Sequence, residues 1–186
     1  MQLASRRVYS GRLLRVDVDT VRFPDGSTGE LELIRHPGAA AVVPCQSDPA
    51  GPDPTILLIR QYRYATGGPL LEIPAGTLDP GEAPEHCARR ELQEEVGATA
   101  SGLAPLTSIW TTPGFTDEVI HLFVATGLTA GRPARERDEF IEVVPRPLSL
   151  VLESIRAGEI RDAKTIAAIL YMAAFRSGIW RPADRE

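Results

Sequence analysis

Hydrophobic and polar residues alternate along two stretches near the start of the chain, residues 12–23 and 28–35. A period of two places the apolar side chains on one face, which is typical of half-buried strands. The Pro24-Asp25-Gly26 segment between the stretches is a turn signal, so the pattern predicts a β-hairpin. Shorter apolar runs predict further strands at 39–44, 55–64, 105–111, 119–126 and 140–144.

Helical patterns occupy three later segments, at 84–96, 147–157 and 163–176. Pro84 and Gly97 bracket the first segment, because proline suits the first turn of a helix and glycine the position after its end. Asp162 stands directly before the third segment as a candidate N-cap. Strands, one helix, more strands and two helices in this order predict an α+β or mixed α/β fold.

The composition indicates a globular protein and excludes some partners, but it does not indicate a reaction. The chain has 186 residues, 43% hydrophobic and 24% charged, which suits one globular domain. Its formal net charge of −5 argues against a nucleic-acid partner, since nucleic-acid-binding domains usually carry a basic face. Two isolated cysteines, no signal peptide and no apolar run long enough for a bilayer predict a cytoplasmic protein with no membrane partner.

Two glutamates share one face of the predicted helix at 84–96. Glu91 and Glu95 lie about 40° apart at about 100° per residue. They border the apolar stripe of the helix, which comprises Ala88, Leu92 and Val96. Like charges four residues apart destabilise a helix, and a hard divalent cation such as Mg²⁺ would remove the repulsion. Helix geometry alone leaves open the alternative that these are ordinary glutamates on a solvated face.

Fixed distances connect a glycine, a glutamate and a run of nine residues. Gly76 is followed by five residues and Glu82, and then by seven residues and the segment Arg90-Glu91-Leu92-Gln93-Glu94-Glu95-Val96-Gly97-Ala98. This spacing resembles the signature of the Nudix hydrolases, G-x5-E-x7-R-E-U-x-E-E-x-G-U, in which U is a bulky apolar residue. Every fixed position matches, and only Ala98 is small for the last apolar position.

The resemblance implies an α/β/α sandwich with a mixed sheet, in which the box at 76–98 forms a loop–helix–loop. It implies an N-terminal β segment at 1–37 and a Nudix domain at 38–186. It also implies that a divalent metal supports hydrolysis of a nucleoside diphosphate linked to another group. The metal ligands that it implies on this helix are Glu91, Glu94 and Glu95.

Four further box positions carry roles that the resemblance implies are structural. Arg90 is expected to pair with a carboxylate such as Glu94. Glu82 is expected to orient the loop and one of the metal ligands without contacting the metal itself. Gly76 and Gly97 are expected at positions where the backbone needs the freedom of glycine.

The flanks of the box are similar to those of ADP-ribose pyrophosphatases. Leu71-Glu72-Ile73-Pro74-Ala75-Gly76 resembles their E-x-P-A-G segment, which implies that the carbonyl of Ala75 binds metal. Arg60-Gln61-Tyr62-Arg63 resembles their Q-[YF]-R segment, which implies that Arg63 contacts the substrate; a surface arginine is the alternative. Pro113 lies 16 residues beyond Gly97, as in that group, which implies substrate contacts at Thr112 and Gly114.

The N-terminal part resembles the extra β segment of the same subfamily. There the segment is exchanged between the subunits of a homodimer and contributes to the partner's site. The resemblance therefore implies a homodimer, with Glu32 and Arg35 as candidates for substrate contacts in trans.

The acidic residues at 135–143 resemble the loop that carries the catalytic glutamate in ADP-ribose pyrophosphatases. Glu139 is the residue we expect to act as base and to approach the metal, together with Glu91 and Glu95 as catalytic groups. Glu136 and Asp138 are close enough in sequence to take its place, and a solvated charged loop is the alternative.

Together these residues predict hydrolysis of ADP-ribose to AMP and ribose 5-phosphate. The cofactor expected is Mg²⁺, with two or three ions per site; Mn²⁺ or another divalent cation is the alternative. A second possibility is a pyrophosphatase acting on GDP-mannose, another nucleotide sugar or a dinucleotide. A third is a domain that binds ADP-ribose without catalysis, although all four box glutamates are present.

Overall fold

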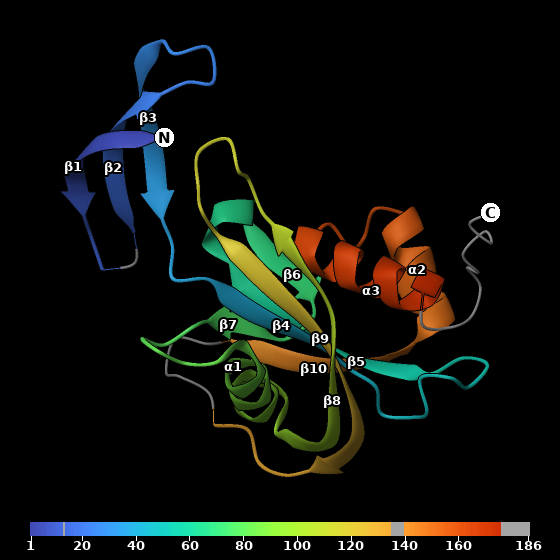
Figure 1. The fold of residues 1–186 in the computed structure, drawn as a ribbon. Helices are drawn as coiled ribbons and strands as arrows, with labels where there is room; N and C mark the ends of the chain where they lie inside the picture. The colour runs from blue at the N-terminus through green and yellow to red at the C-terminus, as the bar shows by residue number, and fades with distance from the viewer. Residues whose placement is uncertain (13, 135–139, 176–186) are drawn as a thin grey trace.

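The computed structural model describes residues 1–12, 14–134 and 140–175. It confirms an α+β fold with a mixed sheet and an additional small antiparallel sheet at the N-terminus. Figure 1 shows this N-terminal sheet standing apart from the body that contains the helices. Within the residues described, no helix combines the length and the apolar character needed to cross a membrane.

The N-terminal sheet has the strand order β1-β2-β3. The predicted hairpin is confirmed as β2 (Arg15–Arg22) and β3 (Thr28–Arg35), which pair antiparallel. Gly26 in the turn has φ +87°, a conformation that glycine adopts at little cost. The strand β1 (Gln2–Ser10) was not predicted, because all nine of its residues are exposed and no apolar alternation marks it.

The body contains two further sheets. One has the order β10-β5-β6 and the other the order β7-β4-β9-β8. Their strands are β4 (Ala39–Pro44), β5 (Thr55–Arg63), β6 (Gly68–Glu72), β7 (Ala75–Thr77), β8 (Ala98–Trp110), β9 (Val119–Ala130) and β10 (Ile141–Pro147). Strand β4 pairs parallel with β9 and antiparallel with β7, which confirms the mixed sheet.

In the described residues, three helices pack against the sheets of the body, and the residues of β4 contact them from two faces. The helices are α1 (Pro84–Glu91), which continues as a π-helical turn (Leu92–Val96), α2 (Leu148–Arg156) and α3 (Ala163–Phe175). Ala41 and Val43 of β4 pack in the core with α2 and α3, whereas Ala40 and Val42 pack with α1. Because alternate residues of a strand point to opposite faces, α1 lies on one face and α2 and α3 on the other.

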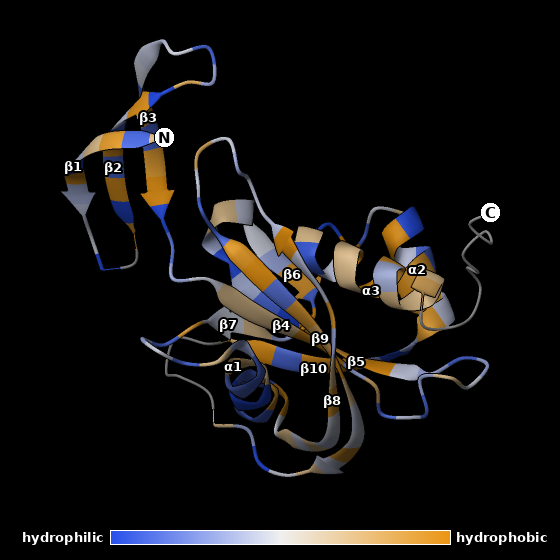
Figure 2. Ribbon diagram, in the orientation of Figure 1, coloured by the Kyte–Doolittle hydropathy of each residue, from blue (hydrophilic) through white to orange (hydrophobic). Residues whose placement is uncertain are grey.

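The helix that carries the box is hydrophilic except where it meets the sheet. Figure 2 shows α1 in hydrophilic colours along most of its ribbon. Cys87 and Ala88 are buried on its inner side, and Leu92 of the π-helical turn is also fully buried. A narrow apolar stripe therefore packs the helix against the sheet, and the charged residues of the helix lie outside this stripe.

Strand boundaries differ from the prediction in the region of small and turn-forming residues. Strand β8 begins at Ala98, seven residues before the predicted run, because its first residues are small or polar. Strands β6 and β7 lie in a Gly- and Pro-punctuated stretch where no strand was predicted. Strand β7 places Ala75 opposite Ala41 of β4, which fixes the start of the box on the central sheet.

Candidate active site

The box glutamates of the helix divide into two inward-facing residues and one outward-facing residue. Glu91 closes α1 and is 7% exposed, and Glu95 in the π-helical turn is 2% exposed. The side chain of Glu94 is 37% exposed and faces the edge of the site. Burial of two carboxylates at the end of one helix excludes the alternative of an ordinary solvated face for Glu91 and Glu95.

Glu91 lies against the backbone of Gly76. A Cβ atom built on Gly76 would lie 1.7 Å from Oε1 of Glu91 and 2.1 Å from its carboxyl carbon. Gly76 is therefore required because Glu91 approaches its backbone closely. Its φ is not positive, so the requirement for glycine does not come from a left-handed conformation. Gly97 ends the π-helical turn with a φ of +74°, in the left-handed region that favours glycine.

Glu95 is fixed by the neighbouring residue of the same segment. The backbone N–H of Ala75 donates a hydrogen bond to Oε2 of Glu95 at 3.0 Å. Both buried carboxylates thus border the Ala75-Gly76 dipeptide, which β7 presents from the sheet. The structure brings together Ala75, Glu91 and Glu95, three of the residues for which the resemblance implies metal binding.

Arg90 connects the loop of the box to its helix. Its Nε and Nη2 donate to the two oxygens of Glu82, each at 3.0 Å, in a bidentate pair. Its Nη1 donates to Oε1 of Glu91 at 2.5 Å and to Oε2 of Glu94 at 3.1 Å. The predicted Arg90–Glu94 pair is present, and Glu82 is the more extensive partner.

The pKa of the Glu82 carboxyl reflects this pairing. The hydrogen bonds from Arg90, followed by one from the backbone N–H of Asp79, lower that pKa to about 2. The same pairing raises the pKa of the Arg90 guanidinium further above its ordinary value. Glu82 therefore stays ionised and holds the loop to the helix, in line with the orienting role that was expected.

A buried glutamate that the sequence did not assign lies on the other side of this segment. Glu72 is 1% exposed, and its Oε1 accepts a hydrogen bond from Nε of Arg63 at 2.8 Å. Its Oε2 accepts from Nζ of Lys164, which also donates to Asp162 at 3.0 Å. Two cations thus compensate the charge of Glu72, and the pairing fixes the direction of the Arg63 side chain.

The first turn of α3 ties the same segment in place. Asp162 accepts hydrogen bonds from the backbone N–H of Thr165 at 2.9 Å and from its hydroxyl at 2.6 Å, which confirms the N-cap. The hydroxyl oxygen of Thr165 in turn accepts from the backbone N–H of Ile73 at 2.9 Å. The cap therefore anchors the residues that lead into Ala75, a function that the sequence could have indicated only through the spacing of Asp162 and Thr165.

The donor atoms of the site fit a hard divalent cation. In the ranges that the structure describes, no three His, Cys, Asp or Glu side chains converge as a metal cluster. The groups that do meet are the carboxylates of Glu91 and Glu95 and the backbone of Ala75 and Gly76. Oxygen donors of this kind suit Mg²⁺ or Mn²⁺, which complete their coordination with water and substrate phosphates.

The remaining predicted substrate residues lie on other elements than these carboxylates. Thr112 and Gly114 are exposed in the loop between β8 and β9, and Glu32 is exposed on β3. This loop contacts β3, since the backbone N–H of Ile34 donates to the carbonyl of Phe115 at 2.8 Å. The candidates for the base, Glu139, Glu136 and Asp138, lie outside the described residues.

Arg35 joins the N-terminal sheet to the body. Its guanidinium contacts Asp17 at 3.2 Å and Asp117 of the loop before β9 at 3.2 Å, and it also pairs with Asp19. Asp117 in addition accepts a hydrogen bond from the backbone N–H of His36 at 2.7 Å. Three carboxylates thus occupy Arg35 within one chain, which gives it a structural task in addition to the proposed contact in trans.

Comparison with known protein families identifies the class. The family model described as the NUDIX domain matches residues 35–168, which is most of the chain. The chain therefore belongs to the Nudix family and is a Nudix hydrolase.

Individual relatives narrow the group. The chain is 38% identical over 172 residues to the ADP-ribose pyrophosphatase of Bacillus subtilis (strain 168), covering 91% of this chain and 90% of the relative. It is 41% identical over 128 residues to the GDP-mannose pyrophosphatase of Cronobacter sakazakii, covering 63% and 66%. A crystal structure of an ADP compounds hydrolase superposes with a TM-score of 0.78 at 25% identity, covering 93% of this chain and 91% of that one.

Proposed function

We propose that this chain hydrolyses the diphosphate of ADP-ribose to AMP and ribose 5-phosphate with Mg²⁺ as cofactor. The observation that carries the proposal is the meeting of two buried carboxylates, Glu91 and Glu95, at the Ala75-Gly76 dipeptide. The relative that acts on ADP-ribose aligns with 91% of the chain, which supports this substrate over GDP-mannose, whose relative aligns with 63%.

In this proposal Glu91, Glu95 and the carbonyl of Ala75 hold two or three Mg²⁺ or Mn²⁺ ions, with Glu94 at the edge. When bound, these ions would neutralise the phosphates and lower the pKa of an attacking water. Glu139 would accept the proton of that water as it attacks phosphorus and the bridging P–O bond breaks. Glu136 and Asp138 are the alternative acceptors.

Arg63 is the proposed contact for the diphosphate. Its Nε is committed to Glu72, which leaves the two terminal amino groups of the guanidinium for phosphate oxygens. Its side chain is 38% exposed, so the group is both anchored and accessible. Thr112 and Gly114 are proposed to contact the rest of the substrate.

We also propose that the active enzyme is a homodimer. In the N-terminal sheet, Leu3, Val8, Tyr9 and Leu31 are each more than 40% exposed, and a second copy of the chain would cover such a surface. Glu32 on the exposed side of β3 would then contribute to the site of the partner, and Arg35 would support it.

The test compares three substrates and one variant. ADP-ribose, GDP-mannose and NADH are offered at equal low concentrations with saturating Mg²⁺, and products are identified by chromatography. We expect AMP and ribose 5-phosphate from ADP-ribose at the highest kcat/KM, and a loss of about 100-fold or more in Glu95→Gln, because a metal ligand loses its charge. Preference for GDP-mannose would establish the second candidate. Tight binding of ADP-ribose without turnover would indicate the non-catalytic domain.

A further inference from the structure

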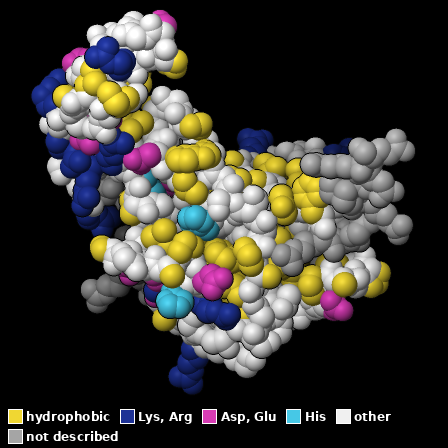
Figure 3. All heavy atoms as spheres, in the orientation of Figure 1, with side chains coloured by type: hydrophobic (Ala, Val, Ile, Leu, Met, Phe, Trp, Pro, Cys, Tyr) yellow, Lys and Arg dark blue, Asp and Glu magenta, His cyan; other side chains and the backbone are white. Residues whose placement is uncertain are grey.

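A hollow of about 340 Å³ lies where the N-terminal sheet meets the loop that follows Gly76. This arginine hollow is lined by Arg12, Arg15, Arg35 and His36 of the N-terminal part and by Thr77 and Leu78 of the box loop. None of its described lining residues is acidic. Figure 3 shows Lys and Arg side chains gathered on the part of the N-terminal sheet that is turned toward the body.

The charges around the hollow are compensated unevenly. Arg15 and Arg35 are directly opposite in the pairing of β2 with β3, an arrangement in which like charges repel. Asp17, Asp19 and Asp117 pair with Arg35, and Asp17 also pairs with Arg7. In the described part of the chain no carboxylate pairs with Arg12 or Arg15, so both guanidinium groups remain available to an anion.

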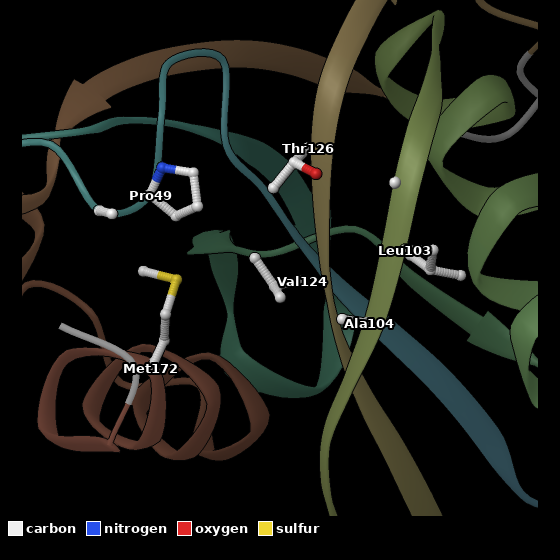
Figure 4. Close-up of a pocket in the computed structure, with 8 residues that line it drawn as sticks. Pro49, Leu103, Ala104, Val124, Thr126 and Met172 are labelled. Carbon is white, nitrogen blue, oxygen red and sulfur yellow. The ribbon is translucent and has the colours of Figure 1, made fainter. Parts of the chain in front are cut away.

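A second cavity of similar size differs from the arginine hollow in the residues that line it. Figure 4 shows a cavity of about 360 Å³ between α3, β8 and β9 whose wall is mostly apolar, with Leu103, Val124 and Met172 and the hydroxyl of Thr126. The two cavities are similar in volume, yet only the arginine hollow presents charged donors. In a chain of net charge −5, such a concentration of arginines marks a place for a small anion.

We propose that the arginine hollow binds a phosphate monoester, with Arg12 and Arg15 on the phosphoryl group. A guanidinium offers a planar fork of N–H donors that matches phosphate oxygens. The volume suits a compound the size of a sugar phosphate, and Thr77, which also lines the hollow, is a polar residue that suits a sugar hydroxyl. Neither Glu91 nor Glu95 lines the hollow, so binding there does not depend on the hydrolytic activity proposed above.

The hollow is nevertheless connected to the box. The carbonyl of Thr77 accepts a hydrogen bond from Nη2 of Arg90 at 3.2 Å, and Thr77 follows Gly76 directly. A ligand that contacts Thr77 therefore touches the loop that holds Glu91 in position. Sugar phosphates, nucleoside monophosphates and inorganic phosphate share the chemistry that the arginines recognise, and the experiment has to separate them.

Binding is measured by titration calorimetry on the full chain in EDTA, where metal-dependent phosphate binding does not contribute. The probes are ribose 5-phosphate, AMP and inorganic phosphate. The variant R12A/R15A should weaken binding about tenfold or more, because hydrogen bonds to charged groups are lost. The control R6A/R22A removes two arginines from the same sheet outside the hollow, and it should change the affinity less than about twofold.

Each outcome decides the proposal. Weaker binding in R12A/R15A but not in R6A/R22A supports the proposal. Tightest binding of ribose 5-phosphate would identify the ligand as a sugar phosphate, and tightest binding of AMP would identify it as a nucleotide. Equal binding of all three probes would show that the site recognises the phosphoryl group alone. In NMR titrations of the unaltered chain, the amide signals of Thr77 and Leu78 should shift, independently of any variant. An equal loss in both double variants, or no binding tighter than about 1 mM by the unaltered chain, would overturn it.

Discussion

Replacement of Gly76 by alanine tests how closely the backbone and the carboxylate of Glu91 must approach. The new Cβ would lie 1.7 Å from Oε1 of Glu91, whereas ordinary van der Waals contact begins at 3.4 Å. The carboxylate therefore has to retreat by the difference between these two distances, about 1.7 Å, and its hydrogen bond with Arg90 at 2.5 Å has to rearrange. Misplacement of a catalytic group by about 1 Å costs about 100-fold in rate, so we expect at least that loss in kcat/KM.

The stability of the variant should change little. The displaced atoms are the end of a flexible side chain, and an off-rotamer side chain costs about 0.5–1.5 kcal/mol. The lower entropy of the unfolded chain returns about 0.4–1 kcal/mol when alanine replaces glycine at a compatible φ. These two terms nearly cancel, so the expected change in Tm is within about 4 °C.

The assay follows release of AMP from ADP-ribose across a Mg²⁺ titration, beside thermal unfolding by circular dichroism. The control is Gly68→Ala, because a Cβ at Gly68 meets no atom within 4 Å. We expect Gly76→Ala to lose activity and to need more Mg²⁺, while Gly68→Ala behaves like the unaltered chain. Activity of Gly76→Ala within about threefold of normal at the same Mg²⁺ requirement would refute the argument, since it would show that Glu91 need not lie where the structure places it.

Two further predictions concern the loop of the box and the N-terminal sheet. Because the folded-state pKa of Glu82 is about 2, below its ordinary value of 4.5, its pairing with Arg90 stabilises the fold above pH 4.5 and is lost as the pH falls toward 2. Urea unfolding midpoints between pH 6 and pH 2.5 should therefore fall less steeply for Glu82→Gln, and identical slopes would contradict this. If Glu32 acts in trans, mixing subunits that carry Glu32→Ala with subunits that carry Glu95→Gln should restore about a quarter of the normal activity, because half of the dimers are hybrids with one complete site. No recovery after verified subunit exchange would place Glu32 outside the partner's site.

Much of the box could be predicted because its positions interact locally. Glu91 and Glu95 lie within one helix, so their shared face follows from helical geometry, and Gly97 and Asp162 act through the caps beside them. The π-helical turn at Leu92–Val96 was not predictable, since nothing in its composition separates it from an α-helical turn. The reason for glycine at position 76 was also not predictable from local sequence, because it depends on the side chain of Glu91, fifteen positions later in the chain.

The parts that could not be predicted depend on partners far apart in sequence. Glu72 belongs to the segment that resembles E-x-P-A-G, yet that segment does not indicate its partners, which are Arg63 and Lys164, the latter 92 residues away. Strand β1 could not be predicted because a strand with no buried face has no alternation of apolar and polar residues. Groups beside one another on a helix could thus be predicted from their spacing and Ala75 from the family resemblance, whereas the ion pairs of Glu72 and the addition of β1 could not.

The bond between Thr165 and Ile73 also has a consequence for the newly made protein. These residues are 92 positions apart, so at about 5–20 residues per second the ribosome releases Thr165 about 5–18 s after Ile73. During that interval the segment leading into Ala75 lacks its anchor, and the nascent chain has no finished site for a diphosphate. The anchor of this segment therefore forms only after α3 has been synthesised, which delays activity until Thr165 is in place.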